Sequence, residues 1–191
     1  MSTIADDILR RHSFSVQDYY RMAETGILRA DARVELIEGE IIDMPPIGSR
    51  HAGTVNQLSR ILQKSVGERA IVQVQNPVRL SESSEPEPDI SLLYPRADFY
   101  KSAHPASSDV LLIIEVAETT LAYDRSVKAP LYARYGIPEY WIIDLEHGQL
   151  ERYREPHELT YARVDRPAVD RPIALEALPE LQLEIGAIFG D

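Results

Sequence analysis

The sequence contains no cysteine among its 191 residues. This absence excludes a disulfide framework, a zinc site with thiolate ligands and a cysteine nucleophile, and it fits a reducing compartment. Long apolar runs are also absent, because residues 110–117, the most apolar stretch, are interrupted by Glu115 and are too few to span a bilayer. The first 15 residues lack the apolar core of a signal peptide. We therefore expect a soluble, cytoplasmic protein without a membrane partner.

Lysine is scarce as well, since 17 of the 20 basic residues are arginine and only Lys64, Lys101 and Lys128 are lysine. The net charge of −11 disfavours broad, nonspecific binding of nucleic acid, because neutralising phosphates requires a basic surface. A local basic groove is still compatible with this charge, and arginine suits bidentate contacts with phosphate. A generally basic nucleic-acid-binding protein is therefore excluded, and a lysine in a special position is easy to notice.

The spacing of apolar residues predicts alternating strands and helices in a chain long enough for one hydrophobic core. Helices are expected over residues 15–25, 49–66 and 124–135. Strands are expected over residues 70–75, 89–93, 109–117 and 139–144, near 181–185, and in two hairpins over 33–44 and 149–164. This alternation indicates an α/β fold with a mixed central sheet, flanked by the second and third helices.

Residues at the ends of two predicted helices resemble known start and stop signals. Ser15 is a candidate cap for the first helix, and Gly26 would end it. Asp124 is the expected cap of the third helix, and Gly136 follows its end. Pro130 lies inside that helix and predicts either a kink or a short first turn.

Glu115 is the most informative candidate for chemistry. It follows a run of five aliphatic residues in the strand that we expect to be buried on both faces. A buried carboxylate is normally paired, hydrogen-bonded or bound to a metal, because burying an isolated charge is costly. Ligands of open α/β sheets also tend to bind where strands end. The alternative is that Glu115 lies just past the edge of the sheet and is solvated.

Asp89 is the second candidate, directly after Pro88 at the head of a predicted strand. Alone it means little, because Pro-Asp is a common turn dipeptide. A second carboxylate on a neighbouring strand changes this, since two adjacent carboxylates repel unless a cation lies between them. Oxygen ligands of this kind favour Mg²⁺ or Mn²⁺ over Zn²⁺.

Lys128 is the third candidate. Asp124 and Tyr132 lie four residues before and after it, on the same face of the predicted helix. The alternative role for Lys128 is an ordinary surface pair with Asp124, which contributes only a few tenths of a kcal/mol.

Six runs of the sequence together resemble the Uma-type restriction endonuclease family, a branch of the PD-(D/E)xK nuclease superfamily. They are VELIEGEII (34–42), SRH (49–51), PEPDISLL (86–93), LLIIEVAETT (111–120), DRSVKAPLYARYGIPEYWIID (124–144) and LPELQLEI (178–185). The combination of IEV, DRxxK and GIPEYWIID is the specific part. The resemblance implies a restriction-endonuclease-like fold in a single domain over residues 1–191, with an N-terminal helical extension (1–30) and a C-terminal β extension (145–191).

The resemblance also implies roles for individual residues. Asp89 is similar to the metal-binding aspartate of the superfamily, and Glu115 is similar to its second acidic ligand. The carbonyl group of Val116 would add a backbone ligand. Glu35 is similar to the additional acidic residue near the start of the fold.

The superfamily lysine is expected two positions after Glu115, where this sequence has Ala117. The family that it resembles moves this lysine to the next helix, which would make Lys128 the catalytic lysine. Tyr132 would then donate a hydrogen bond to a phosphate. His51 would contact a phosphate or assist proton transfer, with a plain structural role as its alternative.

The implied activity is metal-assisted hydrolysis of DNA phosphodiester bonds with Mg²⁺ or Mn²⁺ as cofactor. A homodimer is expected, because cutting a duplex requires two cuts and two-fold symmetry is common. A non-catalytic binding or assembly protein with the same fold is one alternative, favoured by the displaced lysine, the acidic charge and the lack of a separate DNA-recognition module. A hydrolase of small phosphoesters is another.

Overall fold

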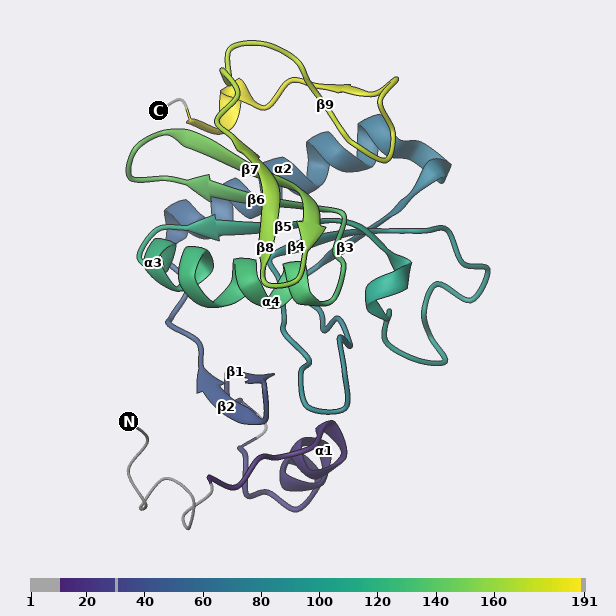
Figure 1. Cartoon of the computed structure of the whole chain (residues 1–191), viewed down its shortest axis with the longest axis vertical. Helices are drawn as coiled ribbons and strands as arrows, with labels where there is room; N and C mark the ends of the chain where they lie inside the picture. The colour runs from purple at the N-terminus through teal and green to yellow at the C-terminus, as the bar shows by residue number, and fades with distance from the viewer. Residues whose placement is uncertain (1–10, 30, 190–191) are drawn as a thin grey trace. The chain divides into compact units, whose positions relative to one another are not determined.

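The computed structural model describes residues 11–29 and 31–189, and the chain divides into two compact units. The N-terminal unit consists of Met1–Pro45 and Arg79–Pro86, and the sheet unit consists of Pro46–Val78 and Glu87–Asp191. Figure 1 follows the elements of both units along the chain. The expectation of a single domain with two extensions stays a prediction.

The N-terminal unit contains the helix α1 (Val16–Glu24) and the hairpin of β1 (Val34–Ile37) and β2 (Glu40–Asp43). Ser15 caps α1 as predicted: its Oγ accepts the Asp18 amide at 3.1 Å, and the Asp18 carboxylate accepts the Ser15 amide at 3.1 Å. This reciprocal pair satisfies two backbone donors that a helix start leaves open. The predicted helix and hairpin are both confirmed.

The segment Arg79–Pro86 closes the N-terminal unit against α1 and the hairpin. The Glu85 amide donates to the Leu36 carbonyl at 2.7 Å, and Tyr20 Oη donates to Glu85 Oε1 at 2.6 Å. The hairpin turn requires Gly39, whose φ is +81° and where an added Cβ would lie 1.8 Å from Ser13 Oγ.

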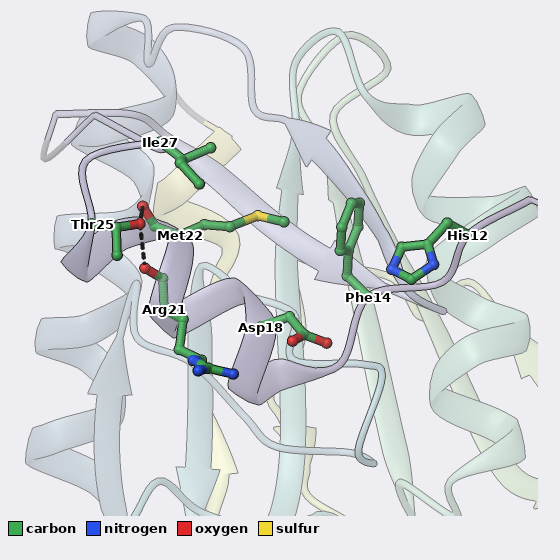
Figure 2. Close-up of a pocket in the computed structure, with 7 residues that line it drawn as sticks. All are labelled: His12, Phe14, Asp18, Arg21, Met22, Thr25 and Ile27. Carbon is green, nitrogen blue, oxygen red and sulfur yellow. Dashed lines mark hydrogen bonds between the residues drawn. The ribbon is translucent and has the colours of Figure 1, made fainter.

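A surface hollow of about 290 Å³ lies beside α1 in the same unit, as Figure 2 shows. Phe14, Met22 and Ile27 supply its apolar wall. Asp18 and Arg21 also line it, but the Asp18 carboxylate is engaged by Ser15. The hollow therefore combines apolar side chains with the polar groups of His12, Arg21 and Thr25.

The sheet unit is built on a six-stranded sheet of order β3-β4-β5-β6-β7-β8. The β5–β6 pair is parallel and the other pairs are antiparallel, so the sheet is mixed, as predicted. Its strands are β3 (Ile71–Val74), β4 (Ile90–Leu93), β5 (Val110–Ala117), β6 (Glu139–Asp144), β7 (Gln149–His157) and β8 (Thr160–Asp165).

The remaining elements of the sheet unit surround this sheet. They are α2 (Ser49–Val66), η1 (Gly67–Arg69), η2 (Ser107–Asp109), α3 (Leu121–Tyr123), the π-helical turn η3 (Asp124–Lys128), α4 (Ala129–Arg134), η4 (Gly186–Phe189), and the small β9 (Ile173–Ala174) and β10 (Gln182–Leu183) sheet. None of the helices in the described ranges is long and apolar enough to cross a membrane.

The two faces of the central sheet are covered by different helices (Figure 1). Leu112, Ile114 and Val116 of β5 join the hydrophobic core that α2 covers. Glu115 lies between two of these residues and points to the opposite face, where it meets Tyr132 of α4. The sequence analysis gave the bounds of α2 and β6 as the structure has them.

The third predicted helix begins earlier than expected. It starts at Leu121, after the N-cap Thr120, so the assignment of Asp124 as its cap is wrong. The Ala129 amide donates to the Asp124 carbonyl, five residues back, which defines the π turn. Pro130 follows in the first turn of α4 and has no amide hydrogen, so it cannot continue the regular hydrogen-bond pattern at that point.

The contact between α2 and the sheet can be tested at Leu62, which is 0% exposed. We expect Leu62→Ala to lower the free energy of unfolding by about 3 kcal/mol, because it leaves a cavity in the core. Urea denaturation measures this change. Leu159→Ala, at a side chain that is 51% exposed, should cost less than about 0.5 kcal/mol; equal losses in the two variants would contradict the packing of α2.

Candidate functional site

Two carboxylates meet where β4 begins and β5 nears its end. The antiparallel register pairs Ile90 with Ile114, which brings the preceding Asp89 beside Glu115. The Asp89 amide donates to Glu115 Oε2 at 3.2 Å. The expectation that these two acidic residues lie on adjacent strands is therefore met by the geometry, while their roles stay predictions.

The Asp89 carboxylate is held from three directions. Its Oδ2 accepts the Val116 amide at 2.9 Å and lies 3.0 Å from Nε2 of His51 in the first turn of α2. Its Oδ1 accepts Nε2 of Gln75 at 3.2 Å. Contacts with β5, with α2 and with the residue that follows β3 fix the orientation of this side chain.

The Glu115 carboxylate receives its contacts from the helix on the other face of the sheet. Its Oε1 accepts the hydroxyl of Tyr132 at 2.8 Å and lies 3.3 Å from Nζ of Lys128. Glu115 is 7% exposed, Lys128 4% and Tyr132 0%. The buried carboxylate is thus paired with a cation and hydrogen-bonded, and the interpretation of Glu115 as a solvated residue past the sheet edge is wrong.

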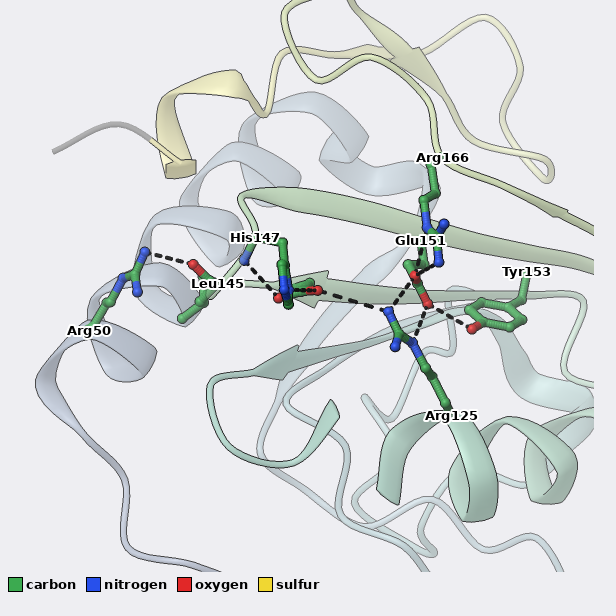
Figure 3. A network of polar contacts seen from close by, with 8 residues as sticks. Arg50, Arg125, Leu145, His147, Glu151, Tyr153 and Arg166 are labelled. Atoms are coloured by element: carbon green, nitrogen blue, oxygen red, sulfur yellow. Dashed lines mark hydrogen bonds and ion pairs between the residues drawn. The ribbon is translucent and has the colours of Figure 1, made fainter. Parts of the chain in front are cut away.

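The helical spacing predicted that Lys128 and Tyr132 share a face, and both reach the same oxygen of Glu115. The π turn that contains Lys128 is anchored at Arg125, whose Nε and Nη2 donate to the Glu151 carboxylate of β7 at 2.9 and 2.7 Å. Figure 3 shows this bidentate pair between the helix that carries Arg125 and the strand that carries Glu151. The anchor holds the turn against the sheet and so helps to place Lys128.

Glu151 is the acceptor for several donors at once. Arg166 donates to its Oε1 through Nε at 2.8 Å and Nη2 at 2.5 Å, and Tyr153 donates to its Oε2 at 2.9 Å. Burial raises the pKa of Glu151, but the hydrogen bonds from Arg125, Arg166 and Tyr153 outweigh burial and lower the pKa to about 2. The carboxylate therefore stays ionised at neutral pH.

Gln75 is a member of the site that the sequence analysis missed. It was placed in the strand over residues 70–75, but β3 ends at Val74 and Gln75 has a left-handed backbone with φ of 47°. Its amide also donates to the Asp89 carbonyl at 3.0 Å. The following Asn76-Pro77 pair is a turn signal that could have indicated the end of the strand.

Glu35 and Val116 are the two remaining residues that the sequence analysis assigned to a metal site. Glu35 lies on β1 in the N-terminal unit, where it is 3% exposed and pairs with Ile42. Val116 reaches Asp89 through its amide, whereas the prediction concerned its carbonyl group. Both assignments stay predictions.

The donor set can be compared with the needs of a metal ion. Among residues 11–29 and 31–189, no group of three or more histidine, aspartate and glutamate side chains is arranged to hold a metal. Asp89 and Glu115 offer a pair of carboxylates, and a Mg²⁺ ion typically takes one or two carboxylates and keeps several waters. The oxygen chemistry of this pair therefore fits Mg²⁺ or Mn²⁺.

Residues 16–186 match the model of the family Uma2, which is described as "Putative restriction endonuclease". The chain belongs to this family. The recognised resemblance is thereby confirmed, and the match covers both units that the structure describes.

Two further proteins are similar to this chain. An uncharacterized protein of Synechocystis sp. is 27% identical over 132 residues, which are 66% of this chain and 75% of that protein. A crystal structure from Anabaena variabilis, described as "a putative nuclease belonging to DUF820", superimposes with a TM-score of 0.68 at 17% identity. It covers 92% of this chain and 97% of the other. This likeness shows that the two proteins share a fold.

The hydrogen bond between Tyr132 and Glu115 should contribute to stability. We expect Tyr132→Phe to lower the free energy of unfolding by about 2 kcal/mol, because a hydrogen bond to a charged group is lost in a buried place. Tyr94→Phe, at a side chain that is 54% exposed, is the matched control and should change little. Equal urea midpoints for both variants would show that the Tyr132 hydroxyl does not hold Glu115.

The lowered pKa of Glu151 predicts a pH-dependent contribution to stability. A carboxyl whose pKa is lower in the folded than in the unfolded protein stabilises the fold above its ordinary pKa, and the gain is lost as the pH falls toward about 2. We expect Glu151→Gln to lower the free energy of unfolding by on the order of 3 kcal/mol at pH 6. This gap between the wild type and the variant should shrink steadily below about pH 4.5. Chemical denaturation across this pH range measures the gap, and a gap independent of pH would contradict the prediction.

Proposed function

We propose that this protein is an endonuclease that hydrolyses DNA phosphodiester bonds with a bound divalent cation. The observation that carries the proposal is the convergence of Asp89 and Glu115 at adjacent strand positions, with Lys128 and Tyr132 on Glu115. Two oriented carboxylates beside an ammonium group suit phosphoryl chemistry, in which positioning and charge stabilisation provide most of the catalysis. The descriptions of the family and of the Anabaena protein support the same class of reaction.

Asp89 and Glu115 would hold Mg²⁺ or Mn²⁺, and we also assign the Val116 carbonyl to this role as a backbone ligand. When bound, the cation supplies Lewis-acid polarisation of the phosphate and a lowered pKa for a water nucleophile. The three contacts on the Asp89 carboxylate keep its oxygens oriented before any ligand arrives. His51 is thus a positioning residue for Asp89 in this proposal.

Lys128 would stabilise the negative charge that develops on the phosphate. Its ammonium group has three donors, of which one serves Glu115 at 3.3 Å. Glu115 therefore fixes the position of the lysine beside the proposed cation site. Tyr132 shares the same carboxylate oxygen at 2.8 Å, so it would orient Glu115 and offer a hydroxyl close to a bound phosphate.

The substrate is proposed to be duplex DNA and the active species a homodimer. A single site cuts one strand, so a two-fold pair of subunits would cut both strands. The acidic net charge of −11 means that contacts with the substrate are local.

Cleavage assays with single variants test the proposal. We expect the purified chain to nick or cut supercoiled DNA in Mg²⁺ or Mn²⁺. Asp89→Asn and Glu115→Gln should each reduce the rate at least about 100-fold, and Lys128→Met should have an effect of similar size, because each removes a preorganised charge. Glu68→Gln, at an exposed residue of η1, is the control and should retain the wild-type rate.

The alternatives have distinct outcomes in the same set of measurements. Full activity in Asp89→Asn, or no cleavage of supercoiled, linear and single-stranded DNA with either metal, would overturn the proposal. If calorimetry also detects no binding of Mn²⁺, the result would favour a non-catalytic binding protein. Turnover of small phosphodiesters without cleavage of DNA would identify a phosphoesterase instead.

A further inference from the structure

A second ion-paired carboxylate lies in the same row of the sheet as Glu115. Ile142 of β6 pairs with Glu115 on one side and with Glu151 on the other. Paired residues point to the same face, and two strand spacings place the two glutamate backbones about 10 Å apart. Each glutamate receives a cation from the same π turn, Lys128 for Glu115 and Arg125 for Glu151.

The two carboxylates differ in what they present to solvent. At Glu115 the partner Lys128 is buried, whereas at Glu151 the side chains of Arg125 and Arg166 are 41% and 61% exposed. The Glu151 side chain itself is only 2% exposed. The exposed side chains of this cluster are therefore the two arginines, while the carboxylates of Glu151 and Asp144 that balance their formal charge are buried.

Neighbouring groups continue this separation of charge. Asp144, at the end of β6, has a side chain that is 3% exposed, and its Oδ2 lies 2.8 Å from Nδ1 of His147 and 4.0 Å from Nη2 of Arg125. The His147 side chain is 55% exposed. In Figure 3 the guanidinium groups of Arg125 and Arg166 converge on Glu151 from two sides. The acids are buried and the bases are outside.

The two arginines are also oriented in advance. Glu151 engages Nε and Nη2 of each, which leaves Nη1 of each guanidinium outside these contacts. A guanidinium that is already fixed loses less conformational entropy when it binds a phosphate oxygen than a free side chain does. The cluster is therefore a preformed site for a phosphodiester group.

We propose that Arg125 and Arg166 bind the backbone of duplex DNA at a phosphate close to the one that is cleaved. This inference rests on the proposed function for the scissile phosphate. The two glutamate backbones are about 10 Å apart, which is close enough for phosphates near each other on one strand to reach both sites. The site supplies the local basic surface that a chain with a net charge of −11 requires for this substrate.

The binding test uses the whole chain and a 20-base-pair duplex in EDTA, so that no cleavage is involved. Fluorescence anisotropy gives Kd at several salt concentrations. We expect Arg125→Gln and Arg166→Gln each to weaken binding about 10-fold and to reduce the salt slope by about 1, and the double variant to reduce it by about 2, because each removes one phosphate contact. Arg163→Gln, at an exposed arginine of β8, is the control and should keep the wild-type slope.

Folding is controlled separately, since Arg125 also anchors the π turn. Arg166→Gln retains the Arg125–Glu151 pair, and thermal unfolding of Arg166→Gln and Arg163→Gln shows that each variant is folded at the temperature of the binding assay. Arg166→Lys keeps the charge and should keep the salt slope, which a purely structural role for the arginine does not predict. If Arg125→Gln fails to fold, the salt slopes of Arg166→Gln and Arg166→Lys test the inference without it.

The inference and the proposed function fail in different ways. A double variant that binds duplex DNA with the wild-type Kd and slope, or a wild-type chain that binds RNA but not duplex DNA, overturns the inference even if cleavage is observed. A chain that binds with the expected slope but never cleaves leaves this inference standing and overturns the endonuclease. A wild-type chain that binds no duplex in EDTA overturns the inference.

Discussion

The pairing of β4 with β5 is the constraint on which the candidate site depends. Because Ile90 lies opposite Ile114, the residue before β4 and the residue after Ile114 meet, and both are acidic. A slip of one residue in this register would turn Glu115 into the hydrophobic core that α2 covers. The aliphatic residues on either side of Glu115 make such a slip unfavourable, so the same residues that form the core also fix the spacing of the two carboxylates.

A charged residue in this strand requires a compensating charge on the face of the sheet that α4 covers. Glu115 is almost fully buried and requires compensation, which Lys128 and Tyr132 provide from the helix. The superfamily position for the lysine is Ala117, which is 1% exposed at the end of β5. Lys128 reaches Glu115 from a different backbone position, at 3.3 Å. The position of the Lys128 ammonium group therefore depends on the path of the helix as well as on the strand.

Much of the fold could be predicted from the sequence because local patterns decide it. The amphipathic spacing over residues 49–66 and the apolar run before Glu115 gave both elements correctly. Two features depend on tertiary contacts instead. Gln75 adopts its left-handed conformation where its amide pairs with the Asp89 carbonyl. Asp124 has the composition of a cap, but its carboxylate accepts the Thr120 hydroxyl at 2.7 Å from within the helix.

The π turn between α3 and α4 limits insertions and deletions in this part of the chain. Each residue of a helix turns by about 100°, so one residue added or deleted between Leu121 and Lys128 would rotate the lysine away from Glu115 while the later part of the helix stayed in place. The exposed connection between β4 and η2 carries no such phase requirement. Homologous chains should therefore differ in length before β5 far more readily than between β5 and α4.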